Sequence, residues 1–176
     1  MSRAIAIVCC ILVLVMIVLS GASGGVDSEI IRIHIRANSN DQIDQAVKYR
    51  VKEQIVEYLT PLLSTCTDRQ SAERVIKSNL VQIEYVADQV LKVNNFDYTT
   101  NAKLNNEYFP DRVYDGYVVE SGYYDALILE LGSGTGDNWW CVVYPPLCFV
   151  NTTYTNGNGI VYKSKLLEII KEFFGE

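Results

Sequence analysis

The chain has 176 residues, of which 49% are hydrophobic and 20% are charged, a composition typical of a globular domain rather than of a disordered tail. Its formal net charge is −6, with 21 acidic and 15 basic side chains. Because no cluster of Lys and Arg stands out, we expect no nucleic-acid partner and no docking on an anionic membrane surface. His34 is the one histidine, which excludes a multi-histidine metal site.

The first 22 residues have the pattern of an export signal. An apolar run of 16 residues, Ala4–Leu19, follows a short positive start and precedes a stretch of small residues. Ser20 and Ala22 fit the −3 and −1 positions of a cleavage site, so residues 1–22 are predicted to be a cleaved signal peptide. The alternative is an uncleaved anchor that reaches to about residue 26, although the helical run spans only ~24 Å of a ~30 Å hydrocarbon core.

The exported part, residues 29–176, is predicted to begin with a strand and a long helix. Strict alternation over Ile31–Arg36 places isoleucines on one face and basic side chains on the other, as in a strand buried on one side. Ser39 and Gln42 match a capping box, which predicts the start of a helix, and Pro61 is expected to end it. The apolar stripe of this helix is predicted to contain Ile43, Ala46, Val47, Val51, Ile55, Tyr58, Leu59 and Leu62.

The remaining chain is predicted to contain further helical segments and then a run of strands. Thr67 and Gln70 match a second capping box, and Ser78-Asn79 is expected to restart the helix, which continues to Asn94-Asn95. The segment Gly132–Asn138 is predicted to be a hairpin loop. Strands are predicted at residues 98–104, 113–119, 124–131 and 139–144, and a closing helix at residues 166–174. This order predicts a single α+β domain with a mostly antiparallel or mixed sheet and amphipathic helices packed on it.

Two constellations of residues suggest chemistry, and neither is favoured. The glycine-rich segment lacks the Lys of a phosphate loop and precedes a predicted strand, so we expect no nucleotide or other cofactor. His34 with Cys141 or Cys148 has the residue types of a base and a thiol nucleophile, but nothing local marks either cysteine as reactive. We therefore expect no catalytic residue. A secreted Cys/His-dependent enzyme acting in the cell envelope is the alternative function.

The cysteines of the exported part allow one internal disulfide at most. Cys66, Cys141 and Cys148 are an odd number, and together with His34 their spacings match no zinc pattern, so no metal is expected. If Tyr144–Pro146 forms a turn, the sulfurs of Cys141 and Cys148 can face each other. If this segment runs straight, the two residues lie ~23 Å apart and cannot bond.

The stretch from Trp139 to Phe149 is predicted to carry or to brace a surface for a partner protein. Its adjacent tryptophans point to opposite faces of a strand, so large aromatic side chains occur on both faces. Pro145-Pro146 cannot lie inside a central strand and is expected to form a rigid turn that presents Tyr144 and Leu147. A core hairpin is the alternative. The candidate partner-binding residues are Trp139, Trp140, Tyr144, Leu147, Phe149, His34 and Asn38.

Three stretches of the chain carry a resemblance to a known family. The first is Arg32–Ser39 with Asp44–Lys48, and the second is Tyr108–Pro110 with Tyr123–Leu127. The third and most specific is Gly136–Phe149, with the sequence GDNWWCVVYPPLCF. Together they resemble the stage II sporulation protein R family of endospore-forming bacteria, and the resemblance covers most of the predicted exported part.

This resemblance implies a secreted, non-catalytic signalling protein of sporulation. It implies export from the forespore into the intermembrane space between forespore and mother cell. There the protein is expected to activate a membrane-embedded aspartic protease that removes the pro-sequence of sigma factor E. The resemblance implies no small-molecule substrate, and membrane contact is expected to be transient, through the signal segment.

Overall fold

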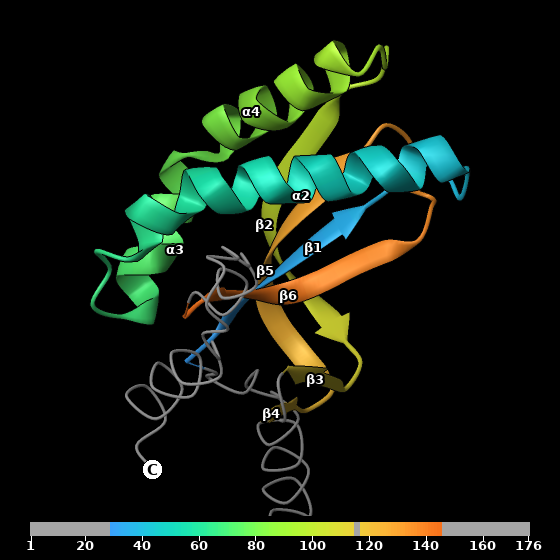
Figure 1. The fold of residues 1–176 in the computed structure, drawn as a ribbon. Coiled ribbons are helices and arrows are strands. Elements are labelled where there is room, and N and C mark those ends of the chain that lie inside the picture. The colour runs from blue at the N-terminus through green and yellow to red at the C-terminus, as the bar shows by residue number, and fades with distance from the viewer. Residues whose placement is uncertain (1–28, 115–116, 146–176) are drawn as a thin grey trace, which may run out of the picture.

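The computed structural model describes residues 29–114 and 117–145 (Figure 1). In chain order the elements are β1 (Ile31–Arg36), α2 (Gln42–Leu63), α3 (Arg69–Ser78), α4 (Leu80–Val93), β2 (Thr100–Phe109), β3 (Arg112–Tyr114), β4 (Tyr117–Val119), β5 (Gly122–Leu131) and β6 (Asn138–Tyr144). The predicted signal peptide and closing helix lie outside the described residues. No helix in the described part of the chain is long and apolar enough to cross a membrane.

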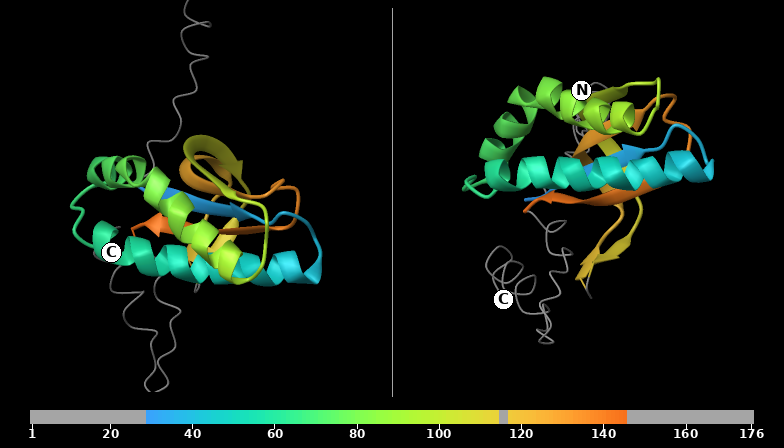
Figure 2. Two further views of the ribbon diagram at one scale, coloured as in Figure 1. Left: turned by 90° about the horizontal axis from the view of Figure 1, so that it is seen from above. Right: turned by 45° about the horizontal axis from the view of Figure 1, so that its top comes forward.

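The sheet is mixed, and its strand order differs from the chain order. In the described residues its four strands follow the order β2-β5-β1-β6, with β1 parallel to β5 and antiparallel to β6. β2 is antiparallel to β5, and the short β3–β4 hairpin lies between them in the chain. Helices α2 and α4 lie along one face of this sheet (Figure 2). The predicted α+β fold with a mixed sheet is thus confirmed.

The glycine-rich segment is not the hairpin loop that we predicted. β1 lies between β5 and β6, so the chain between Leu131 and Asn138 passes over the carboxyl end of β1 instead of joining neighbouring strands. The prediction was wrong because local alternation identifies two strands but does not reveal that a third strand lies between them.

The helix-side core forms where the isoleucines of β1 meet α2. Its fully or almost fully buried members on these two elements are Ile31, Ile33, Ile35, Val47, Val51, Ile55, Leu59 and Leu63. The predicted stripe is wrong in the first turns of α2, where Ile43 is 66% exposed and Ala46 is exposed, whereas Asp44 and Lys48 are buried. These turns meet polar loops rather than the sheet, and Lys48 donates to the carbonyl of Asp137 at 2.9 Å.

The predicted helix ends are displaced by a few residues. The N-cap of α2 is Asp41, whose side chain makes no capping hydrogen bond, while the Ser39 hydroxyl accepts the N–H of Asp41 at 3.0 Å. The capping box of α3 is formed by Asp68 and Ser71, one residue later than the predicted pair. Pro61 lies inside the last turn of α2, because the helix continues past it and buries its last leucine.

A dense set of hydrogen bonds fastens the glycine-rich segment to the residues that follow β1. The Asn38 side chain accepts the N–H of Ser133 at 2.9 Å, and the Asn38 carbonyl accepts the hydroxyls of Ser133 and Thr135. Gly136 donates its N–H to the carbonyl of Ala37 at 2.8 Å. We term these contacts the Asn38 junction, which consists of residues 37–40 and 132–137.

Asp44 lies buried beneath this junction and receives three hydrogen bonds. Asn38, Ser39 and Tyr98 donate to its carboxylate at 2.9, 2.6 and 2.7 Å. Burial alone would raise the pKa of Asp44, but the hydrogen bonds from Ser39, Tyr98 and Asn38 outweigh it and hold the pKa below its ordinary value of 3.8. The start of α2 is therefore tied to the end of β1 through a buried, ionised carboxylate.

We predict that Gly136→Ala strongly destabilises the fold. A Cβ atom at this position would lie 2.2 Å from the Ser39 carbonyl oxygen, a backbone atom that cannot move without breaking the junction. We expect the free energy of unfolding to fall by about 1–3 kcal/mol, measured by denaturant titration. Gly122→Ala is the matched control, because its Cβ would lie 3.5 Å from the Tyr124 ring, an ordinary contact. Equal losses in the two variants would contradict the prediction.

Asp44 is predicted to make the domain lose stability in acid. Its pKa is lower in the folded than in the unfolded chain, so its charge stabilises the fold above the unfolded value near 3.8. This contribution is lost as the pH falls through the lower folded value. Asp44→Asn should cost about 1–3 kcal/mol at neutral pH and should flatten the loss of stability below pH ~4. Denaturant titrations at pH 7 and pH 3 measure both effects, and an unchanged acid slope in the variant would argue against this role.

Candidate binding surface

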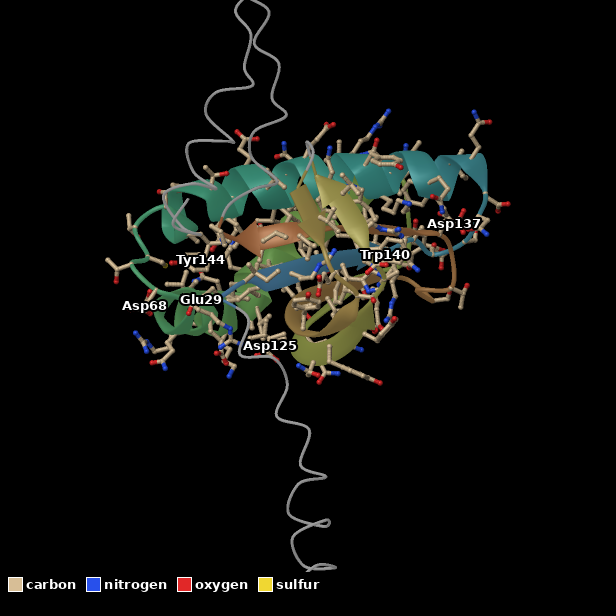
Figure 3. All side chains as sticks on the ribbon, turned by 90° about the horizontal axis from the view of Figure 1, so that it is seen from below. Glu29, Asp68, Asp125, Asp137, Trp140 and Tyr144 are labelled. Carbon is tan, nitrogen blue, oxygen red and sulfur yellow. The ribbon has the colours of Figure 1, made fainter. Side chains whose placement is uncertain are left out.

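The face of the sheet opposite the helices gathers side chains from four strands (Figure 3). On β1, Arg32, His34 and Arg36 point to this face, away from the isoleucines. His34 lies in register with Ile128 of β5 and with Trp140 of β6. We term this side the helix-free face. Its members include Arg32, His34, Arg36, Lys103, Glu107, Phe109, Tyr124, Ala126, Ile128, Glu130 and Trp140.

Charged side chains from three strands form one ion-pair network on the helix-free face. His34 Nδ1 lies 2.8 Å from one carboxylate oxygen of Glu107, and Arg36 contacts the other oxygen. Arg36 also binds Glu130 at 2.6 Å, and Lys103 Nζ lies 2.9 Å from Glu130. The hydrogen bond from Lys103 is the main cause that holds the pKa of Glu130 below its ordinary value, against the effect of burial. Glu107 and Glu130 thus each join two basic side chains.

Aromatic rings cover the neighbouring part of this face. Phe109 is fully buried, and the Arg32 guanidinium lies 4.4 Å from its ring centroid. His34 packs against both Phe109 and Trp140, with ring centroids 5.8 and 5.4 Å away. Arg112 of β3 lies 4.3 Å over the Trp140 ring, so the β3–β4 hairpin folds back onto the sheet. His34 is consequently only 5% exposed.

The structure separates the predicted partner-binding residues. Trp140 is half-buried on the helix-free face and Trp139 is half-buried against the helix-side core, on opposite faces as predicted. Tyr144 is 1% exposed in the helix-side core, so the prediction that this ring is presented at the surface is wrong. The physical reason is a register shift between Ile31 and Arg32, which pairs Ile31 with Tyr144 and turns the ring toward the helices.

Asn38 is engaged inside the domain rather than held free for a partner. Its amide donates to Asp44 and its side-chain oxygen accepts from Ser133, so both ends of the side chain are occupied. Leu147 and Phe149 lie outside the described residues, and their roles stay predictions. Among the predicted partner-binding residues that the structure describes, Trp140 is therefore the one that combines partial exposure with a place on the helix-free face.

A Cys/His-dependent enzyme requires a thiol near His34, and the described residues place none there. Cys141 lies in register with Ile33, on the helix side of the sheet, and it is disulfide-bonded. Cys66 is free and its Sγ donates to a carbonyl of α2 at 3.6 Å. Cys148 lies outside the described residues, so its pairing with Cys141 stays a prediction. No group of three His, Cys, Asp or Glu side chains that could hold a metal occurs in residues 29–114 and 117–145.

The acidic half of the ion-pair network was missed by sequence reasoning. Glu107 lies on β2 and Glu130 on β5, and in each strand successive side chains point to opposite faces of the sheet. This alternation was the available signal for placing the two carboxylates on one face. It does not reveal that β5 lies beside β1 and β2 beside β5, because these strands are far from β1 in the chain.

Comparisons with known proteins agree on one family. The model of a family described as Stage II sporulation protein R (spore_II_R) matches residues 27–154. A curated relative, the stage II sporulation protein R of Bacillus subtilis (strain 168), is 31% identical over 135 residues. This alignment covers 77% of the present chain and 59% of the relative, so the chain spans about three fifths of the relative's length. No solved structure matches significantly.

We predict that His34 and Glu107 are energetically coupled. His34→Gln and Glu107→Gln should each lower the free energy of unfolding, because each leaves a partly buried partner with a weaker hydrogen bond. The double variant should lose less than the sum, with a coupling of about 0.5–3 kcal/mol in denaturant titrations. Glu53→Gln, at an exposed site on α2, is the control and should change stability by less than about 0.5 kcal/mol. Strict additivity would show that the contact carries no energy.

Proposed function

The chain belongs to the stage II sporulation protein R family, and on that premise we propose that it is a secreted signalling protein of sporulation. In this proposal it is exported from the forespore into the space between the forespore and mother-cell membranes. There it binds and activates a membrane-embedded aspartic protease of the mother cell. The protease then removes the pro-sequence of sigma factor E, and the chain itself acts by binding rather than by catalysis.

The family match over residues 27–154 is the observation that carries this proposal, because it includes every described strand and helix. The surroundings of His34 support a binding role. Its Nδ1 faces Glu107, while Cys141 lies on the other side of the sheet and Cys66 in the helix layer. The net charge of −6 supports a protein partner over a nucleic acid. Export in this proposal depends on residues 1–22, which lie outside the described residues.

The proposal predicts that three components suffice for cleavage of pro-sigma E. The full chain, the membrane-embedded protease and pro-sigma E are co-expressed in a host that does not sporulate, and cleavage is followed by immunoblotting. Cleavage is expected only when all three are present. The matched control is the chain without residues 1–22, which should accumulate in the cytoplasm without causing cleavage. An exported, intact chain that leaves pro-sigma E uncut would refute the proposal.

The same assay separates binding from catalysis at His34. His34→Gln keeps a polar planar side chain beside Glu107, so we expect cleavage to stay within about tenfold of the unmodified chain at matched protein levels. Loss of a general base typically lowers a rate by about 10²–10⁴-fold. A loss of that size in a stably folded variant would favour the Cys/His-dependent enzyme.

A further inference from the structure

β2 forms one edge of the sheet in the described part of the chain. It pairs with β5 on its inner side, and no described strand lies on its outer side (Figure 1). An edge strand presents main-chain N–H and C=O groups that can bind a further strand, and proteins usually block such edges. β2 has ten residues, and the two halves of its outer edge differ in whether their main-chain N–H groups have a hydrogen-bond partner among the described residues.

Helix α4 blocks the first half of this edge. Asp88 accepts the main-chain N–H of Thr100 at 2.7 Å, and Glu84 accepts the main-chain N–H of Ala102 at 2.8 Å. The two carboxylates occupy the donors that a further strand would use. The beginning of β2 is therefore closed to strand addition.

The second half of the edge has no such cover. Main-chain groups of successive strand residues point to opposite sides, so the outward donors after Ala102 are those of Leu104, Asn106 and Tyr108. No described residue accepts a hydrogen bond from these three N–H groups. Pro110 follows directly after the strand and limits its length. We term residues 104–108 the open edge.

An exposed aromatic pair stands beside the open edge. Tyr108 and Tyr123 lie opposite each other in the register of β2 and β5, and they are 56% and 61% exposed. Their ring centroids are 5.6 Å apart in an edge-to-face arrangement. Further along, the paired Val113 and Val118 of the β3–β4 hairpin are also exposed. Such a surface favours aliphatic or aromatic side chains of a partner.

Acidic side chains lie at both ends of the open edge. Glu84 and Asp88 occupy one end, and the exposed Asp111 and Glu120 lie just beyond the other end. Two copies of this chain joined along the open edge would bring these like charges together, and each copy carries a net charge of −6. A segment with a basic residue would instead be attracted.

We propose that the open edge binds an extended segment of a partner protein, which joins the sheet as an additional strand beside β2. The segment carries an aliphatic or aromatic residue that packs on Tyr108 and a basic residue that meets Asp111 and Glu120. Main-chain hydrogen bonds supply affinity in this mode, and the side-chain contacts supply specificity. The inference rests on the proposed function, because it takes the partner to be the membrane-embedded protease.

Asn106→Pro and Asn106→Thr form a matched pair of variants for this inference. Proline removes an outward N–H that no described residue uses, and edge strands tolerate proline at such positions. Both variants lose the hydrogen bond from the Asn106 side chain to Asp125 at 3.0 Å, so this loss is the same in the pair. The variants differ in the main-chain N–H of residue 106, which threonine keeps and proline lacks. In the co-expression assay, we expect Asn106→Pro to lower cleavage of pro-sigma E at least tenfold and Asn106→Thr to keep it near the unmodified level.

The outcomes of this experiment are distinct. If the unmodified chain causes no cleavage, the proposed function fails and the edge inference fails with it. If the unmodified chain and Asn106→Pro are equally active, the edge inference alone is overturned. If the unmodified chain sediments as a dimer that Asn106→Pro dissociates, a second copy occupies the edge and the inference is overturned as well.

Amide hydrogen exchange of the unmodified chain tests the same inference without a variant. In the free chain the amides of Leu104, Asn106 and Tyr108 should exchange fast, whereas those of Asn105 and Glu107, which face β5, should exchange slowly. Binding to the detergent-solubilised protease should slow exchange of the three outward amides at least tenfold. A complex that forms while these three rates stay unchanged would overturn the inference.

Discussion

The position of β1 between β5 and β6 is the constraint on which the other features depend. A central strand is hydrogen-bonded along both edges. In this position the isoleucines of β1 pack under α2, while Arg36 on the other face is paired with Glu107 of β2 and Glu130 of β5. The parallel pairing with β5 also requires a long connection, which the three helices and β2 provide. The Asn38 junction lies at the end of β1, where the chain departs toward α2 and later returns to begin β6.

Features with a short period in the sequence could be predicted, because they depend on local geometry alone. The alternation of Ile31–Arg36 identified β1, and the opposite placement of Trp139 and Trp140 followed from the same period. The break at Ser78-Asn79 was visible because Ser and Asn compete for main-chain hydrogen bonds, and α3 indeed ends at Ser78. The fold class followed from the order of these elements.

Features that depend on which elements meet could not be predicted. His34 and Glu107 are 73 positions apart and meet only because β5 lies between β1 and β2. Periodicity assigned Ile43 to a buried stripe, but the first turns of α2 extend past the sheet and meet loops instead. Tyr144 was misplaced because a single register shift at the start of β1 moves its ring to the other face of the sheet.

The arrangement of β1 also determines when the domain can form. β1 is the first described element to be synthesised. It can be paired on both sides only after the residues opposite His34, which are Ile128 of β5 and Trp140 of β6, have also been synthesised. Contacts between residues so far apart form late, since the intervening chain must first be closed into a loop. The helices can form locally in the meantime, but the sheet cannot. β1 is therefore paired along both of its edges only after β6, the last described strand, has been synthesised.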